Sequence, residues 1–305
     1  MDAGVIGVGS MGRNHARVYS ELKTVDNLFV YDTDREAARD VARLHGATAC
    51  DSLGDLLSRA GAVSLCVPTR LHLQVAREVL AAGVHVLIEK PVCTTAAEGR
   101  ALLAAIPGDL VVGVGHIERF NPVVDEIKRI MRRPLYLEMK RHNPASSRME
   151  GTSVVEDLMI HDIDLALHAF LGGRPSSIAS AGNDDVAGAL MRWGETPVYL
   201  STSRKSSKKI RTCYLEEEDF TVEGDLMAQE VFVHHKPGRY TLEDDRYVQE
   251  NIIEKVMVNK LEPLKVELSA FLDCAGRGRP FPITPAEAVE NLEVCEEIRR
   301  GLSCG

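Results

Sequence analysis

The sequence predicts an α/β protein of two domains, in which a doubly wound parallel sheet is followed by a large open, mostly antiparallel sheet. Up to about residue 117, short continuous apolar runs alternate with amphipathic helical segments, as in a parallel sheet covered on both faces. Beyond about residue 134, the strand-like runs alternate polar and apolar residues, as in a sheet with one covered face. A chain of 305 residues is long enough for both domains.

The beginning of the chain has the pattern of a dinucleotide-binding turn. A short apolar run predicts a buried strand, and Gly7, Gly9 and Gly12 follow at the spacing G-x-G-x-x-G, with Ser10 and Met11 between them. The first glycine permits a tight turn, the second lets the backbone approach a pyrophosphate, and the third lets the next helix pack closely. The N–H groups at the start of that helix then face the anion.

An acidic residue follows at the distance expected for ribose recognition. The apolar run Leu28-Phe29-Val30-Tyr31 ends in Asp32, 20 positions after Gly12. The alternative interpretation is a glycine turn that opens an ordinary α/β domain, with an incidental surface aspartate.

The next elements complete the first sheet. Helices are predicted over residues 35–44, 71–82 and 94–105, and strands over 62–67, 84–88 and 110–114. Glu89-Lys90-Pro91 stands at the carboxyl end of one of these strands. Because doubly wound sheets bind their ligands at the carboxyl ends of strands, Lys90 is expected beside the cofactor.

After residue 115 the pattern changes to that of the second sheet. A crossing helix is predicted over 116–132, and strands over 135–140, 177–181, 186–193, 198–203, 209–215, 220–223 and 228–234. Further helices are predicted over 155–171, 264–276 and 285–302, the last opened by a capping box of Thr284 and Glu287. We therefore expect a dinucleotide-binding domain over 1–117, a substrate-binding and oligomerisation domain over 118–284, and a helix over 285–305 that packs back on the first domain.

Composition argues against several classes of protein. The net charge is −9 and no Lys/Arg-rich run occurs, so nucleic acid is not an expected partner. No apolar stretch reaches about 18 residues, and the first residues lack a basic-then-apolar leader, so neither a membrane span nor a secretory signal is expected. The seven cysteines include no C-x-x-C, which favours reduced thiols in a cytoplasm over disulfides or a zinc site.

Three residues are candidates for proton transfer. Burial and a neighbouring nicotinamide cation would lower the pKa of Lys90 and suit it to exchanging a proton with a hydroxyl or carbonyl; the alternative is a surface lysine at a turn. Asp157 and His161 are four residues apart and share a helix face, where a carboxylate orients an imidazole. The alternative is a helix-start aspartate and a surface histidine. Asp164 and His168 extend this stripe, which raises a competing metal site, but no other ligand cluster supports one and we expect no metal.

The motifs together resemble a known family. Gly7-Val8-Gly9-Ser10-Met11-Gly12, Pro68-Thr69-x-x-His72, Ala82-Gly83-Val84-His85-Val86-Leu87-Ile88-Glu89-Lys90-Pro91 and Asp157-x-x-x-His161 occur in the order found in the glucose–fructose oxidoreductase/inositol dehydrogenase/MocA (Gfo/Idh/MocA) family. The resemblance is strong to about residue 170 and looser beyond. It implies a Rossmann domain, a second domain with an open sheet, and oxidation of a sugar or cyclitol hydroxyl, or the reverse reaction, with NAD or NADP.

The resemblance also implies residue roles. Lys90 would be the catalytic lysine, and Asp157 and His161 the pair that positions and deprotonates the hydroxyl, with Lys90 and His161 also binding substrate. Asp32 would accept hydrogen bonds from the ribose hydroxyls and favour NAD by repelling a 2′-phosphate. Arg35 nearby leaves NADP as an alternative cofactor. The cofactor-binding residues would be Gly7, Gly9, Ser10, Met11, Gly12, Asp32, Pro68, Thr69, His72, Glu89 and Lys90. Association through the open sheet would give a homodimer or homotetramer.

A narrower resemblance concerns the substrate. Residues 115–122, Gly-His-Ile-Glu-Arg-Phe-Asn-Pro, and the basic stretch over 208–211 are similar to segments of the UDP-N-acetylglucosamine 3-dehydrogenases of this family. Arg119 and the basic stretch would then pair with a diphosphate, and Asn121 and Asn143 would read hydroxyls or an acetamido group. The alternative is that Arg119 pairs with Glu118 or Asp125 and caps a helix. The expected reaction is NAD-dependent oxidation of UDP-N-acetylglucosamine to its 3-keto form. Another sugar, an inositol or a small ketone is the alternative substrate, and a non-catalytic NAD-sensing regulator is the alternative function.

Overall fold

A computed structural model describes residues 1–144, 152–237, 240–243, 246–249 and 251–302. Contacts divide the chain into two compact units: residues 1–117 with 262–293, called unit 1, and residues 118–261 with 294–305, called unit 2. We expected residues 262–284 in the second domain. They lie in unit 1 because Pro263–Arg277, helix α8, packs against the first helix of the chain.

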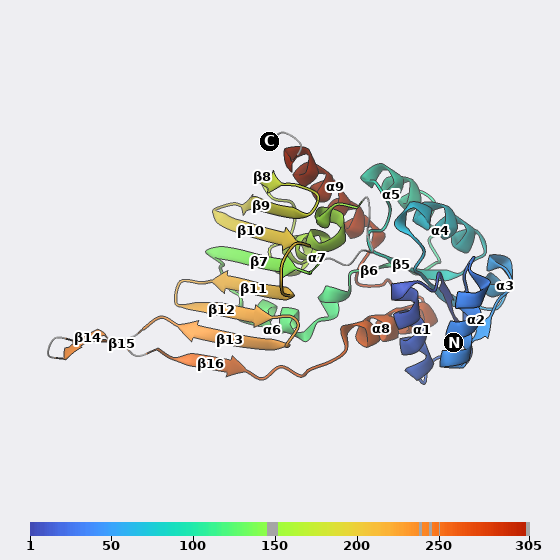
Figure 1. The fold of residues 1–305 in the computed structure, drawn as a ribbon, viewed down its shortest axis with the longest axis horizontal. Coiled ribbons are helices and arrows are strands. Elements are labelled where there is room, and N and C mark those ends of the chain that lie inside the picture. The colour runs from blue at the N-terminus through green and yellow to red at the C-terminus, as the bar shows by residue number, and fades with distance from the viewer. Residues whose placement is uncertain (145–151, 238–239, 244–245, 250, 303–305) are drawn as a thin grey trace. The chain divides into compact units, whose positions relative to one another are not determined.

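Unit 1 is built on a six-stranded parallel sheet (Figure 1). Its strand order is β3-β2-β1-β4-β5-β6, so the order reverses between β1 and β4, and ligands of such sheets bind at that point. All of its strands except short β3 are largely or wholly buried. The strands are β1 Ala3–Ile6, β2 Leu28–Tyr31, β3 Thr48–Ala49, β4 Ala62–Leu65, β5 His85–Glu89 and β6 Val112–Gly115.

Local sequence signals set the helices of unit 1. Asp34 caps α2 by accepting from two backbone N–H groups, and Ser52 caps α3 by accepting from Asp55. Thr284 and Glu287 form the expected capping box at the start of α9, with Glu287 N–H donating to Thr284 Oγ1. The helices are α1 Ser10–Glu21, α2 Arg35–His45, α3 Leu53–Leu57, η1 Thr69–Leu71, α4 His72–Ala81 and α5 Ala96–Leu103, with α8 and the first half of α9 Pro285–Leu302.

Unit 2 is built on an eight-stranded sheet of order β16-β13-β12-β11-β7-β10-β9-β8 (Figure 1). All neighbouring strands are antiparallel except β7 and β10, which run parallel. The predicted fold class is thereby confirmed for both domains. The strands are β7 Tyr136–His142, β8 Ser177–Gly182, β9 Val186–Trp193, β10 Thr196–Ser203, β11 Ile210–Glu216, β12 Phe220–Asp225, β13 Glu230–His235 and β16 Ile253–Val256. A separate two-stranded sheet pairs β14 Tyr240–Glu243 with β15 Arg246–Gln249.

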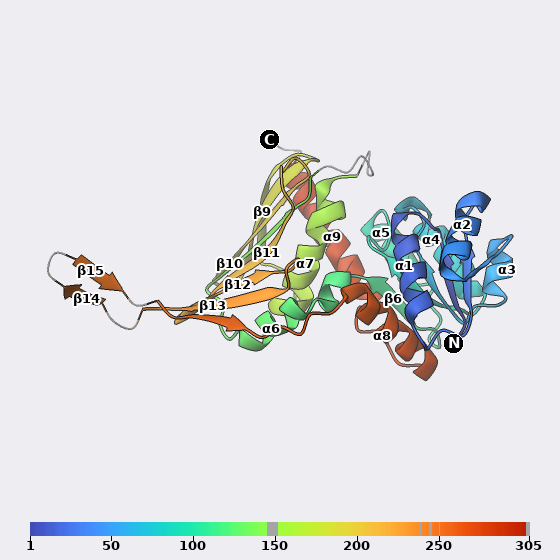
Figure 2. The ribbon, with the colours of Figure 1, turned by 60° about the horizontal axis from the view of Figure 1, so that its bottom comes forward.

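Helices cover one face of this sheet (Figure 2). Along β7, Leu137, Met139 and Arg141 are buried on the helix side, while the residues between them are half-buried or exposed. The covering segments are α6 Pro122–Ile130, the continuous helix formed by η3 Val155–Met159, α7 Ile160–Asp164 and η4 Leu165–Phe170, and the end of α9. Among the described residues, no helix covers the opposite face, which is called the open face (Figure 2). Within the described ranges, no helix is both long enough and apolar enough to cross a bilayer.

Candidate active site

The glycine-rich turn joins β1 to α1, and at two of its three glycines there is no room for a side chain. Gly7 has a φ of +88°, and a Cβ there would lie 2.8 Å from Val67 N. A Cβ on Gly12 would lie 1.8 Å from Gly7 O, whereas a Cβ on Gly9 would meet nothing within 4 Å. Ser10 and Gly9 are exposed at the start of the 12-residue helix α1. The turn therefore leaves open space at a helix N-terminus, which fits a dinucleotide pyrophosphate.

Asp32 is fixed beside this turn. Its Oδ2 accepts a hydrogen bond from Val8 N–H at 2.7 Å, and its Oδ1 accepts one from Asp34 N–H at 2.9 Å. Asp32 follows β2 and Gly7 follows β1, so the parallel sheet brings both to the same edge. These two contacts fix the carboxylate beside the glycine-rich turn, and its recognition of ribose hydroxyls stays a prediction.

The residues predicted after β4 have different surroundings. Pro68 is exposed and Thr69 begins the turn η1, whereas His72 is only 1% exposed. Both ring nitrogens of His72 face backbone carbonyls: Nδ1 lies 2.9 Å from Pro91 O and Nε2 lies 2.9 Å from Val67 O. Burial lowers the pKa of His72, although both carbonyls favour its protonated form. His72 thus joins the loops after β4 and β5, and we expect it to affect a cofactor through them.

Lys90 follows β5 and is half-buried. The preceding Glu89 accepts from Lys90 N–H at 3.1 Å through Oε2, and its Oε1 lies 2.9 Å from Nε2 of His15 on α1. Burial opposes ionisation of Glu89, but the hydrogen bond with His15 and the charges of His15 and Lys90 outweigh it, so the pKa of Glu89 is lowered. An ionised carboxylate only accepts, so His15 Nε2 carries the donated proton.

In unit 2, Asp157 and His161 lie on the continuous helix over 155–170, and both are half-buried. Asp157 Oδ2 lies 3.9 Å from Nη2 of Arg204, which follows β10 and also donates to Thr152 O at 2.6 Å. Arg204 therefore holds the start of the helix that carries both candidates. The contact joins residues 47 positions apart and was not predicted from the sequence.

The same helix has an irregular backbone. Its first and last segments, η3 and η4, are π-helical, and only the five residues of α7 between them are α-helical. Short π-helical turns occur frequently at functional sites because they displace side chains from the ordinary helical positions. In this chain they lie on both sides of His161.

A buried ionic network anchors this helix to the sheet. Arg141 is 1% exposed, and it donates to Asp162 through Nε at 3.0 Å and Nη2 at 2.7 Å, and to Glu118 through Nη1 at 2.7 Å. Arg211 adds a hydrogen bond to the same oxygen of Glu118 at 3.1 Å. Burial opposes ionisation of Glu118, but the two arginines outweigh it and its pKa is lowered. For Asp162 the effect of burial exceeds that of Arg141, and its pKa is raised.

Arg119 and Asn121 are engaged within unit 2. Arg119 donates to both oxygens of Asp164, from Nε at 2.7 Å and from Nη2 at 2.9 Å. Asn121 caps α6 by accepting from Val123 N–H, and its amide group donates to Glu118 and to Leu226 O. These contacts give both residues structural roles, and a contact with substrate stays a prediction.

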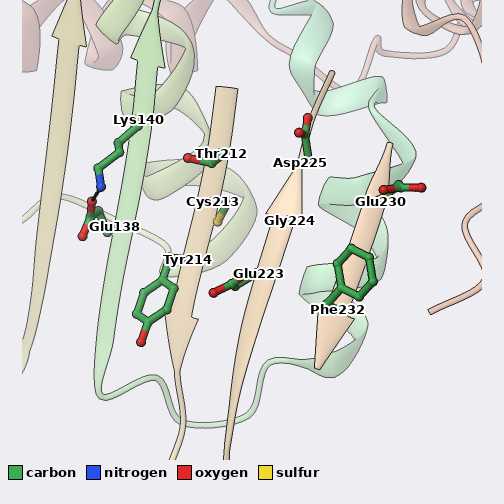
Figure 3. Close-up of a pocket in the computed structure, with 10 residues that line it drawn as sticks. All are labelled: Glu138, Lys140, Thr212, Cys213, Tyr214, Glu223, Gly224, Asp225, Glu230 and Phe232. Atoms are coloured by element: carbon green, nitrogen blue, oxygen red, sulfur yellow. Dashed lines mark ion pairs between the residues drawn. The ribbon is translucent and has the colours of Figure 1, made fainter. Parts of the chain in front are cut away.

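Two other features were weighed as sites. Asp164 and His168 were the basis of the competing metal site, and among the described residues no three His, Cys, Asp or Glu side chains gather around a common point that could hold a metal ion. A hollow of about 510 Å³ lies on the open face of the eight-stranded sheet, lined by side chains including Glu138, Tyr214 and Phe232 (Figure 3). None of the predicted site residues lines it.

Sequence reasoning also missed His15. The residue has no exposed surface and lies on the buried stripe of α1 with Gly12, Ala16 and Tyr19. A histidine on an otherwise apolar stripe was the available signal, because a buried imidazole needs a polar partner. That partner is Glu89, 74 residues further along the chain.

Known proteins match the chain at the level of family and fold. Residues 1–119 match the oxidoreductase family with NAD-binding Rossmann fold. The chain is 32% identical over 289 residues to UDP-N-acetylglucosamine 3-dehydrogenase of Acidithiobacillus ferrooxidans, an alignment that covers 92% of this chain and 90% of that protein. It is 26% identical to inositol 2-dehydrogenase 1 of Saccharopolyspora erythraea, over 90% of this chain and 86% of that one.

Solved structures agree. The A. ferrooxidans enzyme superposes with a TM-score of 0.88 at 29% identity, over 100% of this chain and 98% of the other. Levoglucosan dehydrogenase in complex with NADH and levoglucosan shares the fold, with a TM-score of 0.83 at 16% identity over 99% and 97% of the two chains. The N-terminal domain is thus an NAD-binding Rossmann domain, and the protein is a dehydrogenase acting on sugars. The chain belongs to the Gfo/Idh/MocA family of NAD(P)-dependent oxidoreductases.

Proposed function

We propose that the protein oxidises the 3-hydroxyl of UDP-N-acetylglucosamine to a ketone with NAD. The observation that carries this proposal is the 32% identity, over nine-tenths of both chains, to an enzyme with that name. Lys90, held at the carboxyl end of β5 by Glu89, supplies the amine that this chemistry needs.

In the proposed reaction a secondary alcohol loses a hydride from carbon and a proton from oxygen. NAD, when bound, accepts the hydride. Lys90 donates a hydrogen bond to the substrate oxygen and stabilises the negative charge that develops on it. His161 accepts the hydroxyl proton, and Asp157 favours its protonated form. The products are a ketone, NADH and one proton, so atoms and electrons balance.

The basic loop supports a substrate that carries phosphate. Lys209 and Arg211 are near the beginning of β11, and the charge of Arg211 is the main cause that lowers the pKa of Lys209. Lys209 is exposed and lies two residues before Arg211, so an anion bound there would offset the repulsion between the two cations. We therefore assign the diphosphate to Lys209, beside Arg211, which also donates to Glu118 at 3.1 Å. The sequence predicts that Arg119 shares this role, but its guanidinium already donates to both oxygens of Asp164.

We also propose that two copies associate through the open face of the eight-stranded sheet. Three exposed apolar side chains of β9 and β10 point to this face: Val186 is 42%, Leu190 51% and Tyr199 36% exposed. The unpaired face of a sheet with such side chains favours association. A homodimer or a homotetramer would bury it.

One assay tests the activity. The purified protein is mixed with NAD and either UDP-N-acetylglucosamine or inositol, and NADH is followed by absorbance. We expect turnover with the nucleotide sugar. Turnover with inositol alone would favour the family's inositol dehydrogenases instead, and NADH binding without turnover of any sugar would favour a non-catalytic sensor.

Two variants assign the residues. Lys90→Met should lose turnover and retain NADH binding; if turnover survives, Lys90 does not have the proposed role. Lys209→Met should raise KM for UDP-N-acetylglucosamine about tenfold and change kcat little, because it removes one charged contact worth about 1.5–3 kcal/mol. Lys236→Met, at another exposed lysine of unit 2, is the matched control. An unchanged KM in Lys209→Met would contradict the phosphate assignment.

A further inference from the structure

We propose that two buried histidines, His15 and His72, position Lys90 for catalysis by holding the residue on each side of it. The inference rests on the proposed function, because it assumes that Lys90 acts on the substrate. His15 holds Glu89 and His72 holds Pro91. The two histidines come from different helices, α1 and α4, that begin at the carboxyl ends of β1 and β4.

The contact on the Glu89 side is a continuous chain of hydrogen bonds. His15 Nε2 donates to Glu89 Oε1 at 2.9 Å, and Glu89 Oε2 accepts from Lys90 N–H at 3.1 Å. The side chain of His15 has no exposed surface and that of Glu89 is 10% exposed, so water competes little for this bond. Gly115 on the neighbouring strand leaves the space: a Cβ there would lie 3.1 Å from Glu89 Oε1. The Glu89 carboxylate thus links α1 to the backbone of Lys90, so that the position of α1 fixes the position of Lys90.

The contact on the Pro91 side joins two loops. His72 Nδ1 lies 2.9 Å from Pro91 O, and its Nε2 lies 2.9 Å from Val67 O. A proline has no N–H, so its carbonyl is the backbone group by which Pro91 can be held. The other end of the imidazole reaches the loop after β4, against which Gly7 packs without room for a Cβ.

These two contacts tie Lys90 to the turn that would hold the cofactor. His15 is three residues after Gly12 on the same helix, and His72 reaches the loop that touches Gly7. Neither imidazole is exposed enough to reach a substrate, so both act through Lys90 and are positioning residues. A shift of about 1 Å in a reacting group costs about 100-fold in rate. Loss of either contact should therefore lower kcat more than it weakens cofactor binding.

Amide substitutions test each contact separately. The amide nitrogen of asparagine falls near the position of histidine Nδ1, and that of glutamine near Nε2. We call the contacts of His15 with Glu89 and of His72 with Pro91 the clamp. It uses Nε2 at position 15 and Nδ1 at position 72. Glutamine should therefore replace His15, and asparagine should replace His72. We expect His15→Gln and His72→Asn to stay within about threefold of wild-type kcat. His15→Asn and His72→Gln should lose about 10- to 100-fold in kcat.

The readouts are kcat and KM for UDP-N-acetylglucosamine and the Kd of NADH by fluorescence, which also reports folding. A general loss of stability would lower kcat equally in the two amide variants of one histidine, or in line with their melting temperatures. An equal kcat within each pair therefore contradicts the clamp. If the variants at one histidine do not fold, Glu89→Leu is measured instead. Leucine leaves no side-chain acceptor for Lys90 N–H or for His15, so kcat should fall more than NADH affinity does; an unchanged kcat would contradict the clamp.

Lys90→Met, measured alongside, separates the two proposals. Turnover by this variant would overturn the role of Lys90 itself. An inactive Lys90→Met together with equal kcat within each amide pair would overturn the clamp alone.

Discussion

Replacing Arg141 by methionine should destabilise the protein strongly. The side chain is 2% exposed, and its fork neutralises two carboxylates that are 3% and 6% exposed, on Asp162 and Glu118. Methionine fills much of the same volume but leaves the carboxylates in place. Removing one partner of a buried ion pair costs about 3–5 kcal/mol, because the remaining charge stays buried without compensation.

The hydrogen bonds of the two carboxylates indicate which of them accounts for the loss of stability. Glu118 keeps hydrogen bonds from Arg211 and Asn121 in the variant. Asp162 has hydrogen bonds from Arg141 at Oδ1, and its Oδ2 is buried with no hydrogen-bond partner among the described residues. Asp162 should therefore account for most of the loss. A loss of about 4 kcal/mol corresponds to a fall of about 10 °C in Tm.

The loss should depend on pH with a definite sign. Without Arg141, the pKa of Asp162, already raised by burial, rises further above its unfolded value. A carboxyl with a raised pKa binds its proton more tightly in the folded state, so stability returns as pH falls towards that pKa. We expect the Tm deficit of Arg141→Met to be smaller at about pH 5.5 than at about pH 7.5.

Thermal unfolding of three proteins checks this reasoning. Wild type, Arg141→Met and the double variant Arg141→Met/Asp162→Asn are compared at both pH values. The double variant has no charge at position 162 and should recover about 2 kcal/mol, with a flatter pH dependence. The reasoning is refuted if Arg141→Met lowers Tm by less than about 3 °C, or if its deficit grows as pH falls.

Two further predictions concern the cofactor and the assembly. Asp32→Asn keeps an acceptor for Val8 N–H but removes the negative charge. In initial-rate assays, kcat/KM for NAD should fall about 10- to 100-fold and the preference for NADP over NAD should rise. An unchanged preference would mean that Asp32 does not bind the ribose. Leu190→Asp should convert the oligomer to monomers in light scattering, because it buries a charge in the proposed interface, whereas Leu44→Asp on α2, where the leucine is 74% exposed, should leave the mass unchanged. A Leu190→Asp protein with the wild-type mass would place the interface elsewhere.

The fold could be predicted where one local rule decided each element. Buried apolar runs gave the parallel strands of unit 1, and a capping box placed the beginning of α9 at Pro285. Residues 236–263 carried no such periodicity, and the three strands β14, β15 and β16 there were missed. The side chains of β16 are mostly exposed, so the alternation that marks a half-buried strand is absent.

Part of the candidate site could likewise be predicted from the sequence, and part could not. Motif spacing placed the glycines, Asp32 and Lys90 at one edge of the parallel sheet, because the carboxyl ends of its strands share that edge. For contacts between residues far apart in the chain, the sequence did not indicate which residue is the partner. The hydrogen bond of His15 with Glu89 spans 74 residues and that of Arg141 with Glu118 joins a strand to a turn, so only the folded chain shows either.

We propose that Lys90 and His161 act on the same substrate hydroxyl. A crystal structure of the protein with NADH and UDP-N-acetylglucosamine tests it most directly. We expect Lys90 Nζ and a ring nitrogen of His161 both to lie within about 3.2 Å of the sugar's 3-oxygen, beside the nicotinamide ring. A complex in which either side chain points away from that oxygen would contradict it.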